Sequence, residues 1–398
     1  MSLPASHDRP LLPGSNSLGE PQTLGVMGGG QLGRMFVHAA QAMGYATAVL
    51  DPDPASPAGR VSHHHIQTSY TDAGGLAQLA ACSAAITTEF ENVPADALRT
   101  LAAQRRVAPG AAAVAIAQDR AAEKAHFVRC GVACAPYAEL RSAAELDLLP
   151  DDLLPGILKT ARMGYDGKGQ VRVADRAELA RAWGALGHVP CVLEKMLPLA
   201  LECSVIVARA ADGAMVNFPV QRNLHRAGIL AVTEVFDGNL PAPLAAQAVA
   251  DARAVAQGLD YQGVLCVEFF VLTDGRLVVN EIAPRPHNSG HYTQNACDLS
   301  QFDLQVRTLA GLPLTPPRQH SPAIMLNLLG DLWGRTGPDA APGWAAVLAL
   351  SGTHLHLYGK QEARPGRKMG HLNVTGTSIE AVRAVALQAA KILGIEAF

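Results

Sequence analysis

The sequence predicts a chain of mixed class, with an α/β domain first, an α+β region after it and a small region at the end. Three observations predict this. From Thr23 onward, apolar strand-like segments alternate with helical patterns, which is typical of a parallel sheet covered on both faces. From Ile157 onward, shorter strand-like segments follow one another at hairpin-like spacings. A proline-rich joint, GLPLTPPRQHSP at 311–322, then precedes the last region.

The composition is that of a globular protein that can bury large cores. The chain has 398 residues, 49% of them hydrophobic, which predicts two or three domains. Its 32 basic and 35 acidic side chains are mixed along the chain, so no basic stripe is available to bind a nucleic acid. No apolar run reaches the roughly 18 residues of a membrane span. We therefore expect neither a nucleic acid nor a membrane as a partner.

Cysteine usage and the first residues bear on the location of the protein. The seven cysteines are scattered without CxxC spacing, which favours reduced thiols over a disulfide framework or a zinc site. This pattern predicts a cytoplasmic protein. The first 21 residues are rich in Pro, Ser and Gly and carry no basic-then-apolar signal. We expect residues 1–21 to be a disordered leader.

The first domain begins with a strand at 23–27 (TLGVM), a glycine loop, and a helix with Leu32, Met35 and Phe36 on one face. A strand at 46–50 (ATAVL) ends before Asp51, and another short apolar strand lies at 84–90 (AAITTEF). This alternation of strands and helices implies a parallel sheet covered on both faces.

The glycine loop has the spacing Gly28-x-Gly30-x-x-Gly33, with Asp51 near the position where a dinucleotide site has its ribose-binding acid. The start of the following helix presents free N–H groups and a partial positive charge, which suit a phosphate. Three interpretations stay open: a dinucleotide, another phosphorylated or polar ligand, and a purely structural turn, since close helix–strand packing alone can require such glycines.

The middle region combines helices with many short strands. Helical patterns cover 119–130 and 244–258. The strand-like segments are GILKT (156–160), QVRV (170–173), CVLEKM (191–196), CSVIVA (203–208), MVNFPV (215–220), GILAVTEV (228–235), VLCVEFFVL (264–272) and RLVVNEI (276–282). Such spacing predicts an α+β region with much antiparallel sheet.

One hairpin of this region has the chemistry of a phosphate site. In ILKTARMGYDGKGQVRV (157–173), a strand ending near Lys159 leads into a loop with three glycines and Lys168. Glycines let backbone N–H groups approach oxyanions, and lysines add compact positive charge for a polyphosphate. The loop is no Walker A motif, because GxxxxGK[ST] is absent and a strand follows it. The alternative is a flexible surface hairpin.

Two carboxylates lie on otherwise apolar strands. Glu268 is on one strand, and Asn280 and Glu281 end the next, across the turn TDG. A carboxylate on an apolar strand is costly unless a cation holds it. Two carboxylates and an amide oxygen suit Mg²⁺, which also bridges nucleotide phosphates. The alternative is a pair of carboxylates in salt bridges with Arg285 or another arginine.

The last region has strand-like segments near AIMLNLL, HLHLY and GHLNVT, and a helix from Ser378. With these elements in place, the chain as a whole resembles the ATP-grasp enzymes and, among them, the 5-(carboxyamino)imidazole ribonucleotide synthetases. The similar segments run in order from about 23 to about 376: GGGQLGRM, TEFENVP, KTARMGYDGKGQ, EKMLPLALECS, FPVQRNLHRAGIL, NEIAPRPHNSGHYTQNACDLSQF and KQEARPGRKMGHLNV. Met163 stands where the family usually has a glycine, and the leader lies outside the pattern.

The resemblance implies three domains after the leader. These are a Rossmann-like pre-ATP-grasp domain (22–118), an ATP-grasp domain (119–316) with a mobile lid (about 131–195), and a small C-terminal domain (317–398). It also implies that the glycine loop helps to bind a ribonucleotide rather than a dinucleotide.

The resemblance further assigns site residues. The residues implied to bind ATP are Arg120, Lys159, Gly164, Tyr165, Asp166, Gly167, Lys168, Gly169, Gln170, Glu194, Lys195, Met196, Leu197, Glu202, His225, Asn280 and Glu281. Those implied around the ribonucleotide are Gln31, Leu32, Glu91, Tyr165 and Asp166, with Lys360 and Arg367 on its 5′-phosphate. Glu268 and Glu281 are implied to ligate Mg²⁺, and Arg285, His287 and Asn288 to bind bicarbonate or accept a proton.

The implied reaction carboxylates 5-aminoimidazole ribonucleotide. Bicarbonate attacks the γ-phosphoryl group of ATP to give carboxyphosphate and ADP, and the exocyclic amine then captures carbon dioxide. Because carboxyphosphate hydrolyses readily, a lid that excludes water has a purpose. We expect a cytoplasmic homodimer. The competing hypotheses are a sister ATP-grasp enzyme, such as a formate-using glycinamide ribonucleotide transformylase or a biotin carboxylase, a nicotinamide-dependent oxidoreductase, and a non-catalytic nucleotide-binding protein.

Overall fold

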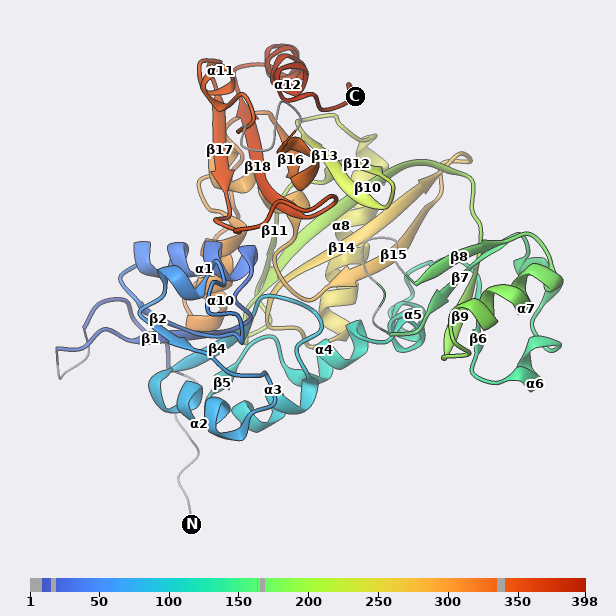
Figure 1. Cartoon of the computed structure of the whole chain (residues 1–398), viewed down its shortest axis with the longest axis horizontal. Coiled ribbons are helices and arrows are strands. Elements are labelled where there is room, and N and C mark those ends of the chain that lie inside the picture. The colour runs from blue at the N-terminus through green and yellow to red at the C-terminus, as the bar shows by residue number, and fades with distance from the viewer. Residues whose placement is uncertain (1–8, 16–18, 163, 165–168, 335–340) are drawn as a thin grey trace.

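The computed structural model describes residues 9–15, 19–162, 164, 169–334 and 341–398. It contains three sheets, and Figure 1 shows how they are arranged: the N-terminal domain in blue, a small sheet in green at the opposite side, and a large sheet between and above them. Among the described residues, none of the helices combines the length and the apolar character needed to cross a membrane.

The N-terminal sheet is parallel throughout, with the strand order β3-β2-β1-β4-β5. Every residue of β2 is buried, as expected for a strand covered by helices on both faces. The elements of this domain are β1 (Thr23–Met27), α1 (Gln31–Ala42), β2 (Ala46–Leu50), η1 (Gly59–Val61), β3 (His64–Ile66), α2 (Ala73–Cys82), β4 (Ala85–Thr88), α3 (Ala95–Ala102), β5 (Arg106–Val107) and α4 (Ala111–Ala117).

The small sheet is antiparallel, with the order β6-β9-β7-β8. It follows α5, which begins at Arg120 because the Asp119 carboxylate accepts the N–H groups of Ala121 and Ala122. The elements of this part are α5 (Arg120–Arg129), β6 (Tyr137–Leu140), α6 (Ala143–Leu146), η2 (Asp151–Leu153), β7 (Gly156–Thr160), β8 (Gln170–Val173), α7 (Arg176–Ala185) and β9 (Cys191–Lys195).

The large sheet has nine antiparallel strands in the order β15-β14-β10-β12-β13-β16-β18-β17, with β11 paired to β10. Helix α8 covers β10 and β14 and forms the largest hydrophobic core with them. The elements up to the proline-rich joint are β10 (Leu199–Arg209), β11 (Met215–Asn217), β12 (Gln221–Arg226), β13 (Ile229–Val235), α8 (Ala242–Gly258), β14 (Gly263–Leu272), β15 (Leu277–Ala283), η3 (Asn288–Gly290), α9 (Thr293–Ala296) and α10 (Gln301–Ala310).

The C-terminal strands extend the large sheet instead of forming a sheet of their own, because β16 pairs with β13. The C-terminal elements are β16 (Ala323–Leu329), η4 (Gly330–Leu332), α11 (Trp344–Leu348), β17 (Thr353–Leu357), β18 (Lys368–Thr375) and α12 (Ile379–Leu393). Helix α12 packs on β16 and β18 through a separate apolar cluster. The sequence did not indicate the continuous sheet, since pairing between distant strands leaves no local pattern.

Part of the expected leader is ordered. Leu11 donates its N–H to the Ala310 carbonyl at 2.8 Å, and its own carbonyl accepts the Tyr45 hydroxyl at 2.5 Å. Leu11 also packs against the apolar cluster between α1 and α10. The prediction of a disordered leader is therefore wrong for residues 9–15. A single leucine in a Pro-rich and Ser-rich segment is too weak a signal to predict that this segment packs on α1 and α10.

Candidate active site

A cavity of about 920 Å³ lies between the small sheet and the large sheet, and the loop after β4 closes one side of it. Strands β7 and β9 contribute its wall on the small sheet, and β10, β14 and β15 contribute the wall on the large sheet. Because these strands are far apart in the sequence, the site exists only when all three parts of the chain fold together.

A buried carboxylate with two lysines forms the base of the cavity on the side of the small sheet. The Glu194 carboxylate on β9 accepts a hydrogen bond from the Lys159 ammonium of β7 at 3.0 Å. It also lies 3.2 Å from the Lys124 ammonium of α5. Burial would raise the pKa of Glu194, but the charges of Lys159 and Lys124 lower it. The predicted phosphate ligand Lys159 is therefore held by a carboxylate in this structure.

Among the described residues, the strand edge next to this group has one free donor. The N–H groups of Lys195 and Met196 donate to the carbonyls of Pro136 and Pro155 at 2.9 and 3.0 Å. Within the described part of the chain, the N–H of Leu197 has no hydrogen-bond acceptor. Of the three predicted backbone contacts for adenine, Leu197 is thus the one with a donor still available.

The two predicted metal ligands lie opposite each other on adjacent strands. Glu268 of β14 and Glu281 of β15 are direct partners in the register, and the register shifts by a bulge just after Glu268. Glu281 accepts Arg120 at 3.1 Å, so one of the two carboxylates is in a salt bridge with an arginine, although not with Arg285. The side-chain oxygen of Asn280 is buried without a hydrogen-bond donor among the described residues.

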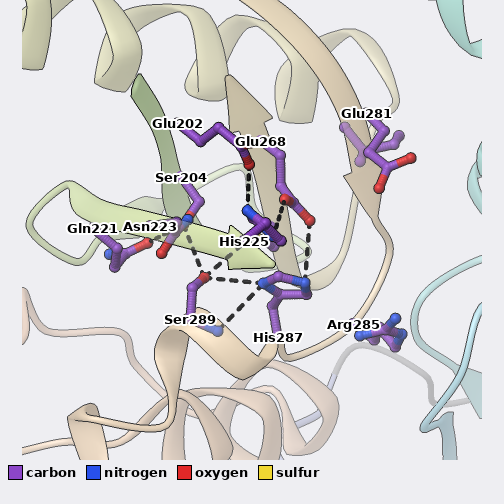
Figure 2. Close-up of polar contacts among 12 residues, drawn as sticks. Glu202, Ser204, Gln221, Asn223, His225, Glu268, Glu281, Arg285, His287 and Ser289 are labelled. Atoms are coloured by element: carbon purple, nitrogen blue, oxygen red, sulfur yellow. Dashed lines mark hydrogen bonds and ion pairs between the residues drawn. The ribbon is translucent and has the colours of Figure 1, made fainter. Parts of the chain in front are cut away.

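Glu268 is held by two histidines, as Figure 2 shows. Nε2 of His287 lies 3.1 Å from one carboxylate oxygen, and Nε2 of His225 lies 4.0 Å from the other. Nδ1 of His225 contacts the Glu202 carboxylate. Burial would raise the pKa of Glu268, but His287 above all, with His225 and Arg285, lowers it to about 2. Glu268 thus has a lowered pKa on the cavity wall, although only 13% of its side chain is exposed.

The cavity reaches the N-terminal domain through an ion pair. Arg285, just beyond β15, donates Nε to the Glu91 carboxylate at 2.5 Å. Burial would raise the pKa of Glu91, but the charge and hydrogen bond of Arg285 lower it to about 2. Gln118 fixes the Glu91 backbone by donating to its carbonyl at 2.6 Å. The pair connects a predicted substrate residue to a predicted catalytic residue.

The glycine loop does not present an open phosphate site in this structure. The Glu89 carboxylate accepts the N–H groups of Gly30 at 2.8 Å and Gly33 at 3.0 Å. Asp51 accepts the N–H of Gly29 at 2.7 Å and the Tyr70 hydroxyl at 2.6 Å, so it too is satisfied within the protein. These carboxylates occupy the N–H groups that a dinucleotide phosphate would need, which argues against a dinucleotide at this loop. The implied contact of the loop with a ribonucleotide stays a prediction.

The cavity brings together most of the predicted residues. Those that line it are Glu91, Arg120, Lys159, Gly164, Gln170, Glu194, Lys195, Met196, Leu197, Glu202, His225, Glu268, Asn280, Glu281, Arg285, His287 and Asn288. Tyr165, Asp166, Gly167 and Lys168 lie outside the described residues. Gly169 has φ +71° and packs against Thr160 without lining the cavity.

The remaining predicted substrate residues do not line the cavity. Leu32 is buried in the apolar cluster with α10, so only its backbone is available to a ligand. Gln31 begins α1 and is half-buried. Lys360 donates to the Lys368 carbonyl at 2.7 Å, and Arg367 donates to the Glu362 carbonyl at 2.8 Å.

Sequence reasoning missed several residues of the site. Lys368 lines the cavity, next to the predicted Arg367. Glu123 also lines it and accepts the Ile282 N–H at 2.8 Å, which anchors the end of β15. Burial raises the pKa of Glu123 to about 8. Arg120, Glu123 and Lys124 are spaced i, i+3 and i+4 on one helix, and this spacing was the available signal.

Family comparisons follow the same three parts of the chain. Residues 21–118 match the ribonucleotide synthetase preATP-grasp domain, 125–302 the ATP-grasp domain, and 323–385 the phosphoribosylaminoimidazole carboxylase C-terminal domain. A Brucella melitensis protein named N5-carboxyaminoimidazole ribonucleotide synthase is 44% identical over 366 residues, which cover 89% of this chain and 97% of the relative. The chain belongs to the N5-carboxyaminoimidazole ribonucleotide synthase family. A Bacillus subtilis member of the same name is 40% identical over 354 residues, covering 88% of this chain and 90% of its own length.

Solved members of the N5-carboxyaminoimidazole ribonucleotide synthase family have the same fold. The ADP complex of one such synthetase has a TM-score of 0.87 at 39% identity and covers 97% of this chain and 98% of its own. A synthase from Aspergillus clavatus, solved with ADP and 5-aminoimidazole ribonucleotide, has a TM-score of 0.85 at 31% identity and covers 94% and 99% of the two chains. The predicted family, the fold class and the ATP-grasp ligase class of enzyme are confirmed.

Proposed function

We propose that the protein carboxylates 5-aminoimidazole ribonucleotide to N5-carboxyaminoimidazole ribonucleotide in purine biosynthesis, using ATP and bicarbonate and releasing ADP and phosphate. The observation that carries this proposal is the single cavity in which Arg120 and Lys159, the carboxylates Glu268 and Glu281, and Arg285 all meet. Relatives named for this product, and a solved relative containing ADP and 5-aminoimidazole ribonucleotide, support it.

ATP is proposed to lie between the two sheets. Adenine would accept the free N–H of Leu197, and the phosphates would extend toward Arg120 and Lys159 on the cavity wall. Lys159 is already paired with Glu194, and Lys124 keeps that carboxylate compensated when Lys159 turns toward a phosphate. A buried carboxylate left without any cation would be costly, so the second lysine makes this exchange feasible.

The donor set fits Mg²⁺. Glu268 and Glu281 face each other across β14 and β15, and the side-chain oxygen of Asn280, which has no hydrogen-bond donor in the described part of the chain, would be a third hard ligand. Magnesium, when bound, neutralises charge on the transferring phosphoryl group. Arg120 now pairs with Glu281 and also lies on the cavity wall, so it can shift toward the phosphates when the carboxylate has another cation.

Bicarbonate and the ribonucleotide are proposed to meet next to the N-terminal domain. An oxygen of bicarbonate attacks the γ-phosphorus, and the bond to the β-phosphate oxygen breaks, which gives carboxyphosphate and ADP. Carboxyphosphate releases phosphate, and the exocyclic amine bonds to the carbon dioxide and loses a proton. Arg285, His287 and Asn288 remain the proposed residues for this half, supported by their position on the cavity wall beside Glu91.

The ribonucleotide phosphate is proposed to lie near the β17–β18 hairpin, with Lys360 and Arg367 and the backbone of Gln31 and Leu32. The support is chemical, since Arg is suited to bind two phosphate oxygens at once. A cytoplasmic homodimer remains part of the proposal. All seven cysteines are free thiols, which suits a reducing compartment.

A phosphate-release assay tests the function. The protein is incubated with ATP, Mg²⁺ and bicarbonate, alone, with 5-aminoimidazole ribonucleotide, or with glycinamide ribonucleotide and formate. We expect phosphate release to be stimulated by 5-aminoimidazole ribonucleotide and not by the second pair. Stimulation by glycinamide ribonucleotide and formate instead would assign the chain to the sister transformylases.

A further inference from the structure

A row of buried polar side chains leads away from His287, as Figure 2 shows. Ser204 on β10 and Ser289 in η3 have no exposed surface, Asn223 on β12 is 6% exposed, and Thr233 on β13 is fully buried. None of these side chains lines the cavity. Buried polar groups are costly unless they are bonded, so four of them in one row require an explanation.

The two nitrogens of His287 face opposite kinds of partner. Nε2 faces a carboxylate oxygen of Glu268 at 3.1 Å, and a carboxylate only accepts. Nδ1 faces the backbone N–H of Ser289 at 3.4 Å, and a backbone N–H only donates. A neutral imidazole carries one proton. In the neutral ring, the two contacts therefore agree in placing the single proton on Nε2.

The Ser289 hydroxyl strengthens this arrangement. Its oxygen lies 2.9 Å from Nδ1 of His287 and 2.8 Å from the Ser204 hydroxyl. With the ring proton on Nε2, Nδ1 is an acceptor, so the Ser289 proton points to it. The Ser289 oxygen is then free to accept the proton of Ser204.

The residues farther from the cavity donate in the same direction, toward His287. The Asn223 amide donates to the Ser204 hydroxyl at 2.9 Å. The Asn223 oxygen accepts the Thr233 hydroxyl at 2.9 Å, which fixes the amide in this orientation. Each group from Thr233 to His287 thus donates toward Glu268. Hydrogen bonds that share one direction polarise and strengthen each other.

The Gln221 side chain offers the Ser204 hydroxyl a competing acceptor. The Gln221 side-chain oxygen is 3.0 Å from the Ser204 hydroxyl, while its amide nitrogen contacts the Pro219 carbonyl. If the Ser204 proton pointed to Gln221, the Ser289 hydroxyl could turn to Ser204 and accept a proton from Nδ1. The Ser289 contact is the shorter of the two, and the backbone N–H of Ser289 opposes a proton on Nδ1.

We propose that Ser289 is a positioning residue that holds His287 as its Nε2–H tautomer, so that His287 acts as a hydrogen-bond donor to Glu268. The row of Ser204, Asn223 and Thr233 fixes the direction of the Ser289 hydroxyl. The consequence for turnover rests on the proposed function, in which Glu268 is a metal ligand, whereas the tautomer does not depend on it.

The tautomer is tested directly by long-range ¹H–¹⁵N correlation spectra of the full chain with ¹⁵N-labelled histidine. The His287→Gln variant assigns the His287 signals. We expect an N–H type shift at Nε2 and a lone-pair type shift at Nδ1 in the protein without ligands, and a loss of this single pattern in Ser289→Ala. A proton on Nδ1 in the wild-type protein would overturn the proposal.

Kinetics test the consequence with a matched control. Ser289→Ala should lower kcat about 10- to 100-fold with little change in the KM for ATP, because a partner of a ligand-orienting histidine is lost. Thr308→Val also removes a buried hydroxyl, but that hydroxyl bonds only to carbonyls of its own helix at 2.9 and 3.0 Å, so its kcat should stay near that of the wild type. Equal losses in both variants would mean a merely structural role.

Two further variants keep the outcomes separable. Ser204→Ala leaves the Ser289 hydroxyl in place and should lower kcat less than Ser289→Ala, so the idea stays testable if Ser289→Ala folds poorly. In a His287→Gln background, Ser289→Ala should have little additional effect on kcat. Full turnover of His287→Gln would reject the role of His287 in the proposed function while the spectra still decide the tautomer.

Discussion

The Glu89 carboxylate accepts the N–H of Gly30 at 2.8 Å, at the point where α1 begins. It accepts the N–H of Gly33 as well, and so occupies the position in which a dinucleotide phosphate would lie on a Rossmann-like domain. A carbon atom added at Gly30 would lie 2.5 Å from this carboxylate, although Gly30 has an ordinary φ of −73°. Close approach to Glu89, and not backbone strain, explains this glycine.

The first prediction follows from this contact. Glu89→Ala should lower the free energy of unfolding by about 1–3 kcal/mol, because one buried and one partly buried N–H group lose their acceptor. Urea denaturation measures it. Glu89→Gln keeps one acceptor oxygen and should lose less. The wild-type protein should give no saturable NAD(H) fluorescence signal, and a clear micromolar signal would contradict the structural interpretation of the loop.

The second prediction concerns the cross-strand carboxylates. Glu281→Gln should lower ATP turnover by at least about 100-fold with the fold intact, because the divalent cation loses a negatively charged ligand. Such a cation stabilises the charge of the transition state by several kcal/mol. Phosphate release and circular dichroism measure the two quantities. Glu234→Gln is the matched control, because Glu234 lies on the same sheet but does not line the cavity, and it pairs with Arg383 of α12 at 2.7 Å. Near wild-type turnover in Glu281→Gln would place Mg²⁺ elsewhere.

The third prediction separates the two substrates. Arg367→Ala should raise the KM for the ribonucleotide about tenfold or more, because a charged hydrogen bond to its 5′-phosphate is lost, and should leave the KM for ATP nearly unchanged. Initial-rate kinetics with each substrate varied in turn give both values. Arg364→Ala is the control and should change neither KM value, because Arg364 is an exposed neighbour that lies 3.5 Å from the Glu362 carboxylate. Equal effects of Arg367→Ala on both KM values would mean that the hairpin is not the phosphate site.

The fourth prediction is a pH dependence of stability. The pKa of Glu91 is lowered from 4.5 to about 2 in the folded protein, because the charge and hydrogen bond of Arg285 outweigh the partial burial of the carboxyl group. A depressed folded-state pKa adds stability that is present above pH 4.5 and lost as the pH falls toward 2. Between these values the free energy of unfolding should fall more steeply for the wild type than for Glu91→Gln. Urea denaturation at several pH values gives both curves, and parallel curves would show that the pair contributes nothing.

The sequence by itself determined the order of the elements and the chemistry of the main segments. Apolar periodicity predicted the strands and the long helices, because burial of one face imposes that period on the residues. The helix expected over 119–130 is α5, and the one expected over 244–258 is α8. The segments around Lys159, Glu268 and Glu281 were informative because charged residues on apolar strands are costly without a partner.

Only the tertiary structure decided which of these groups meet. Glu194 and Lys124 are 70 residues apart in the sequence, and no local pattern states that they form one buried ion pair. The same holds for Glu89 at the start of α1 and for Ser289 behind His287, since both contacts depend on how strands and loops pack. Sequence patterns record what each element buries, whereas the partner of a buried polar group is fixed by packing between elements that are distant along the chain.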